Sequence, residues 1–134
     1  MTYSALLSRI GLGLTIALAW AGHASAATTL CVGCFAIVRS DGTLAFGHGD
    51  VSTKRIAPGA YEVNFSKPVT RCAFSATSGQ CSASNNFNLM GEISVLLGST
   101  GNKNIFVETF DSAGTDHDNP FHLVAACNTS PAKY

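Results

Sequence analysis

Charged residues are few in this sequence, and neither sign dominates. Of its 134 residues, eight are Lys or Arg and eight are Asp or Glu. A protein that binds nucleic acid needs a basic surface, and one that lies on a membrane needs a polybasic or amphipathic segment. Neither is found beyond Ala26, so we expect the mature chain to have no nucleic-acid partner and no membrane association.

Long hydrophobic runs are also absent, except near the N-terminus. Arg9 precedes an apolar run over 10–20, and an Ala-Ser-Ala sequence typical of a signal-peptidase site ends at Ala26. The run is too short and too rich in glycine for a membrane-spanning helix. We therefore expect residues 1–26 to be a helical signal peptide cleaved between Ala26 and Ala27, and the protein to be secreted or to lie in a periplasm or outside the cell.

Tryptophan is missing from the mature chain, because the single one, Trp20, lies within the expected signal peptide. Exposed tryptophan is a favoured surface for stacking against ligands, so its absence counts against a lectin. Other aromatic side chains could form a sugar-binding platform. Alternation directs Tyr61 and Phe65 inward, however, and we assign both to the core.

The mature chain also lacks the periodicity of any helix longer than one turn. Instead, short runs rich in Val, Ile, Phe and Thr alternate in polarity between turn residues. The runs are 35–39, 43–46, 51–56, 61–65, 71–77, 92–97, 105–110 and 121–127. They predict an all-β fold, a compact antiparallel β-sandwich or barrel of about eight short strands tied by disulfides. We expect a β-domain over 35–127, an N-terminal segment over 27–34, and a C-terminal tail over 128–134.

Two hairpins are expected within this fold. Asp41 and Gly42 separate the first two runs, and an Asp-Gly pair favours a tight turn in which both central residues have positive φ. The last two runs, 105–110 and 121–127, are joined by a polar turn, and we expect them to form the hairpin around which the other strands are arranged. In the second of these runs Cys127 shares a face with the larger apolar side chains, where a buried disulfide would lie.

Five cysteines remain after removal of the signal peptide: Cys31, Cys34, Cys72, Cys81 and Cys127. In an exported protein, cysteines are expected to form disulfides. Because five is odd, at least one thiol stays free or pairs with another chain. The sequence is therefore compatible with a homo-oligomer or an intermolecular disulfide.

Cys31 and Cys34 form a C-x-x-C motif, which occurs in redox centres and as half of a zinc site. A thioredoxin-like centre needs a βαβ unit, and a zinc site needs two further ligands at suitable spacing. The sequence has no βαβ pattern, so we favour a structural disulfide. It would join Cys31 to Cys34, or one of them to Cys81.

The His and Asp side chains near residue 117 form the one candidate for a metal or acid–base site. Asp116, His117 and Asp118 lie in a turn, and His122 and His48 could join them as ligands. His122 alternates out of phase with its apolar neighbours, which favours a surface histidine beside a solvated turn. No G-x-S-x-G motif is present, so we assign no catalytic residue and expect no cofactor.

Three stretches carry a resemblance to a known group of proteins: FAIVRSDGTLAFGHG, GAYEVNFSKPVTRCAFSAT and IFVETFDSAGTDHDNPFHLVAAC. They resemble small, exported bacterial all-β domains that are largely uncharacterised, over residues 35–127. The resemblance implies that Cys72 pairs with Cys127 and that the other three cysteines are additions. It implies no catalytic residues.

The sequence thus predicts an exported, non-enzymatic β-domain that acts as a recognition, adhesion or surface-structural module. Its partner would be a protein or a glycan surface ligand. Two alternatives remain: a small metal-dependent hydrolase that uses the His/Asp cluster, and an exported inhibitor or effector. In the last case loops such as 78–86 would form the contact surface, because loops on a rigid scaffold often carry binding.

Overall fold

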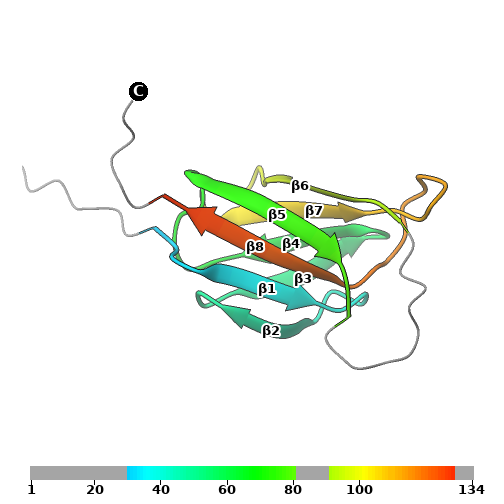
Figure 1. Ribbon diagram of the computed structural model, residues 1–134, viewed down its shortest axis with the longest axis horizontal. Helices are drawn as coiled ribbons and strands as arrows, with labels where there is room; N and C mark the ends of the chain where they lie inside the picture. The colour runs from blue at the N-terminus through cyan, green and yellow to red at the C-terminus, as the bar shows by residue number, and fades with distance from the viewer. Residues whose placement is uncertain (1–29, 81–90, 129–134) are drawn as a thin grey trace, which may run out of the picture.

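The protein is a sandwich of two four-stranded antiparallel sheets (Figure 1), in a computed structural model that describes residues 30–80 and 91–128. Sheet A has the order β2 (Leu44–His48), β1 (Cys34–Val38), β8 (Phe121–Cys127) and β5 (Cys72–Ser78). Sheet B has the order β3 (Ser52–Ala57), β4 (Ala60–Asn64), β7 (Asn104–Thr109) and β6 (Ile93–Leu97). The predicted all-β sandwich is confirmed, and each predicted strand has a counterpart.

Several sequence-based expectations lie outside the described residues. They concern the signal peptide, Cys81, most of the loop 78–86 and the tail beyond Asn128. The first strand begins at Cys34, one residue earlier than expected, so the C-x-x-C motif runs directly into the sheet. Within the described ranges, no helix is long and apolar enough to cross a membrane.

The core lies between the two sheets and is formed by alternate residues of their central strands. From sheet B, Tyr61 and Val63 point inward as predicted, and from sheet A, Phe121 and Leu123 do so; all four are fully buried. The Tyr61 and Phe121 rings meet edge to face, with centroids 5.1 Å apart. Large apolar side chains thus interdigitate across the sandwich, which is the arrangement that alternation at both inner faces requires.

The predicted hairpin between the last two strands is wrong, because β7 and β8 belong to different sheets. β7 pairs with β4 and β6, whereas β8 pairs with β1 and β5. The connecting segment first turns back on itself, with the Asp111 carboxylate accepting hydrogen bonds from backbone N–H groups, and then crosses from sheet B to sheet A. Alternation shows where a strand lies and which face it buries, but not which strand pairs with it.

The hairpin of β1 and β2 is confirmed, but its turn differs from the expected one. Gly42 has a φ of 86°, whereas Asp41 does not have a positive φ. The Gly42 N–H donates to the Arg39 carbonyl, and the Arg39 N–H donates to the Thr43 carbonyl. This is a turn closed by a glycine in the left-handed region, in which one residue rather than two needs positive φ. The Asp41 carboxylate caps it by accepting from the Thr43 N–H and hydroxyl.

Candidate functional site

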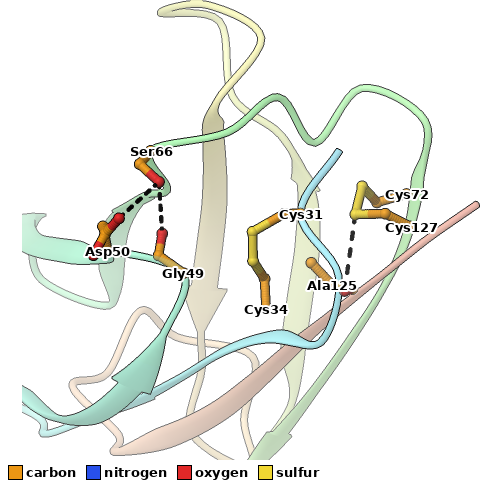
Figure 2. The surroundings of a disulfide bond; sticks show 8 residues. All are labelled: Cys31, Cys34, Gly49, Asp50, Ser66, Cys72, Ala125 and Cys127. Atoms are coloured by element: carbon orange, nitrogen blue, oxygen red, sulfur yellow. Dashed lines mark hydrogen bonds between the residues drawn. A yellow bond between two sulfur atoms is a disulfide. The ribbon is translucent and has the colours of Figure 1, made fainter. Parts of the chain in front are cut away.

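Both disulfides lie at the same end of the sandwich, where the described chain enters β1 and leaves β8 (Figure 2). Cys72 and Cys127 are directly opposite on β5 and β8, so their bridge fastens an edge strand to the middle of sheet A. This is the pair that the resemblance implied. Cys31 pairs with Cys34, which decides between the alternatives left open by the sequence. Two such bridges are typical of proteins that fold in an oxidising compartment outside the cytoplasm.

The Cys31–Cys34 bridge is buried and packs against the backbone of Gly49, which follows β2 (Figure 2). Gly49 has a φ of 101°, and a Cβ at this position would collide with the sulfur atoms of both cysteines. Only glycine satisfies both conditions, since it tolerates positive φ and lets the backbone approach closely. The C-x-x-C bridge therefore fixes the path of the chain between β2 and β3.

A pocket of about 470 Å³ opens beside this bridge. Its lining comes from the C-x-x-C segment, from β2 and the turn that follows it, and from the segment after β4. The lining residues are Cys31, Val32, Cys34, Leu44, Gly47, His48, Gly49, Asp50, Val51, Ser66 and Lys67. We call it the disulfide-end pocket. Its volume falls within the range of about 300–1,000 Å³ that is usual for small-molecule sites.

Polar side chains of the disulfide-end pocket keep unused hydrogen-bonding capacity. The Ser66 hydroxyl lies 3.2 Å from the Gly49 carbonyl and 3.3 Å from the Asp50 carboxylate, which ties the two walls together. Asp50 makes no other side-chain hydrogen bond, and Lys67 has no ionic or hydrogen-bonding partner among the described residues. Asp50 is also the one non-glycine residue with positive φ in the described ranges, at 47°. Such backbone conformations concentrate at functional sites, although Asp tolerates them better than most residues.

Next to this pocket, the outer face of sheet A carries three aromatic side chains that alternate away from the core. Phe35 on β1 lies beside Phe46 and His48 on β2, with ring centroids 5.7 Å and 6.4 Å away, and the His48 ring is stacked on Phe35. Phe46 is 64% exposed. We call these three residues the aromatic platform. His48 belongs to both the platform and the pocket, so the two surfaces are continuous.

The outer face of sheet A has no formally charged side chain on any of its four strands. The strand register and alternation place ten residues on this face: Phe35, Ile37, Phe46, His48, Ala73, Ser75, Thr77, His122, Val124 and Ala126. The outer face of sheet B, in contrast, carries Lys54, Glu62 and Glu108. The two outer faces of the sandwich therefore differ in formal charge, although sheet B also exposes apolar side chains such as Leu96.

Sequence reasoning missed the aromatic platform because both faces of β1 are apolar. Phe35 and Ile37 alternate with Ala36 and Val38, and size alone would assign the larger pair to the core. The structure buries Ala36 and Val38, which share a face with the disulfide-bonded Cys34. A usable signal existed, since a strand that begins with a core cysteine should bury the residues two and four positions later.

The structure does not bring the candidate His and Asp residues together. His48 lies on β2 and His122 on β8, with β1 between these two strands, and His117 is exposed in the crossover segment together with Asp116. The Nε2 atom of His122 is buried without a hydrogen-bond partner in the described part of the chain. Across those residues, no group of three or more His, Cys, Asp or Glu side chains could hold a metal ion.

Asp118 has a structural role at the opposite end of the sandwich. Its Oδ1 atom accepts from Arg55 Nε at 2.7 Å, from the Gly59 N–H at 2.7 Å and lies 3.2 Å from the Tyr61 hydroxyl. The Tyr61 hydroxyl also lies 2.9 Å from the Ser40 carbonyl, in the turn between β1 and β2. Asp118 and Tyr61 therefore connect the crossover segment to turns of both sheets, an arrangement that we call the Asp118 clasp.

The Asp118 clasp shifts the pKa of its members. The hydrogen bond from the Arg55 side chain, followed by that from the Gly59 N–H, lowers the pKa of Asp118. Burial, followed by the charge of Asp118, raises the pKa of Tyr61 to about 12. The charged Asp118 carboxylate and the neutral phenol of Tyr61 can therefore share a hydrogen bond, which gives the buried Tyr61 hydroxyl a polar neighbour.

Comparisons of this chain with protein-family models, curated proteins and solved structures find no match.

Proposed function

We propose that this protein is an exported, non-enzymatic recognition module that binds its partner on the outer face of sheet A. The observation that carries the proposal is the aromatic platform on a sheet face without formal charges. Exposed apolar surface bordered by polar groups commonly marks an interaction site. The two disulfides support export, because such bridges persist in oxidising compartments.

Rigid presentation is the second physical argument for a recognition module. At one end, the Cys31–Cys34 bridge fixes the segment that leads into β1 and packs against Gly49 just after β2. At the other end, the turn between these two strands is held by the clasp. A pre-ordered surface loses little conformational entropy on binding, so more of the contact energy contributes to affinity.

A matched pair of surface variants tests this proposal. Phe46 and Leu96 are exposed apolar residues on sheets A and B, 64% and 47% exposed. Three labelled proteins would be compared: the mature protein and its Phe46→Ser and Leu96→Ser variants. Each would be applied to intact cells of the producing organism and to its secreted polymers. We expect Phe46→Ser to abolish binding and Leu96→Ser to retain it. Equal binding by all three proteins, or by none, would contradict the proposal.

N-terminal sequencing tests the predicted export signal. The sequence of the exported protein should begin at Ala27.

A further inference from the structure

We infer that the aromatic platform and the disulfide-end pocket together form a binding site for a neutral oligosaccharide. The inference rests on the proposed function and specifies its ligand. One part of the site supplies exposed aromatic surface, and the adjoining part supplies donors and acceptors. This combination matches the chemistry of a pyranose chain, whose rings have apolar C–H faces and hydroxyl groups around their edges.

The platform suits stacking because Phe46 and His48 are exposed on the outer face of sheet A, beside Phe35. His48 of β2 is paired with the half-buried Phe35 of β1, and its ring is stacked on Phe35 with an interplanar angle of 17°. Phe46 is paired with Ile37, and its ring lies 5.7 Å from that of Phe35 at an angle of 44°. Val124, 49% exposed, lies beside Phe35 on β8 and extends the apolar surface. A sugar ring laid over Phe46 or Phe35 would bury both apolar faces from water.

The pocket supplies the complementary polar contacts. Asp50 offers acceptor atoms, Lys67 offers three donors without a partner in the described ranges, and the exposed His48 imidazole offers ring nitrogens. A hydroxyl group both donates and accepts, so vicinal hydroxyls can satisfy a carboxylate and an ammonium together. Figure 2 shows Asp50 and Ser66 joined next to the Cys31–Cys34 bridge, which holds this part of the wall in place.

The charges favour a neutral ligand over an acidic or basic one. Asp50 and Lys67 carry opposite charges in the same pocket, and the adjoining face of sheet A carries no formal charge. A polyanionic glycan would gain from Lys67 but meet the unpaired charge of Asp50, and a cationic chain would meet the reverse. Neither gains a net attraction, whereas a neutral chain uses both groups as hydrogen-bonding partners.

The test measures binding of the disulfide-intact mature protein to defined oligosaccharides by titration calorimetry. The neutral probes are hexamers of β-1,4-glucose, β-1,4-mannose, β-1,4-N-acetylglucosamine and α-1,4-glucose, and the charged probes are hexamers of uronic acid and of glucosamine. We expect saturable binding of at least one neutral hexamer. Phe46→Ala should weaken it about tenfold, as loss of one aromatic stacking contact predicts. Asp50→Asn keeps a side chain that tolerates positive φ and should also weaken binding, while Leu96→Ala on sheet B should not.

The outcomes separate this inference from the proposed function. No binding of any neutral hexamer, preference for a charged one, or neutral binding unaffected by Phe46→Ala would overturn the inference. If the Phe46-dependent adhesion to cells or polymers persists in that case, the recognition function stands with a different ligand. Phe46 is largely exposed, so its variants should fold, and unchanged thermal unfolding verifies this.

Discussion

Removing the Cys72–Cys127 disulfide should destabilise this domain mainly by freeing its unfolded state. The bridge joins residues 55 positions apart, so it closes a long loop that runs from β5 to β8. In the chain-entropy description, opening a loop of that length costs about 4 kcal/mol of unfolding free energy. That is a large fraction of the 5–15 kcal/mol that holds a typical domain together.

The Cys31–Cys34 bridge provides the contrast, because it closes a loop of sequence separation 3. The same relation gives about 2 kcal/mol for its chain entropy. Both sulfur atoms are buried, so replacement by alanine also removes packing, at about 1 kcal/mol for each buried atom lost. The two losses are therefore similar in size, but only the first arises chiefly in the unfolded chain.

Urea unfolding of the two double alanine variants distinguishes these origins, in a Cys81→Ser background that prevents disulfide exchange. We expect the Cys72→Ala/Cys127→Ala variant to lose about 4 kcal/mol and to show a steeper denaturant dependence, since its unfolded chain exposes more surface. The Cys31→Ala/Cys34→Ala variant should keep the slope of the parent. An unchanged slope in the first variant, or a loss below about 2 kcal/mol, would refute this reasoning.

Three further predictions concern single residues. Gly49→Ala should lower the free energy of unfolding by about 2 kcal/mol or more, measured by urea unfolding, because it combines positive φ with a collision against the Cys31–Cys34 sulfurs. Asp118→Asn should cost about 1–2 kcal/mol at pH 7. The difference from the parent should shrink as the pH falls below about 4, because the unfolded carboxyl is protonated there while the folded one, whose pKa is lowered, stays charged to lower pH; an undiminished difference at pH 2 would contradict this. Thiol titration of the denatured monomer should give one free thiol per chain, and none in Cys81→Ser, since the two disulfides use the other four cysteines.

Strand positions could be predicted from this sequence, but strand partners could not. The run 121–127 coincides with β8, and 61–65 differs from β4 by one residue, because alternation and turn residues are local signals. Pairing of β4 with β7 joins residues 40 to 48 positions apart, and no local pattern encodes it. The same limit explains the error over β7 and β8, whose short connection suggested a hairpin although the chain changes sheets there.

The candidate site was harder to predict than the fold, because it depends on which side of β1 faces the core. The sequence directed attention to the histidines and aspartates near residue 117, where charge and turn residues coincide. In the structure Asp118 is occupied by structural hydrogen bonds, and the surface with unused capacity lies at the other end, around Asp50 and Lys67. A cluster of reactive residue types in a sequence therefore shows which functional groups are present. It does not show whether those groups are already used in structural hydrogen bonds.

The two ends of the sandwich are fastened by different means, and this difference fits the proposed site. At the clasp end, Asp118 and Tyr61 join the turns of both sheets through hydrogen bonds, and the core beside them is closed. At the other end, the disulfide-end pocket opens beside the buried Cys31–Cys34 bridge. Small exported domains compensate for limited cores with disulfides. Both bridges lie at the end where the pocket opens, so covalent links constrain the chain beside the proposed site.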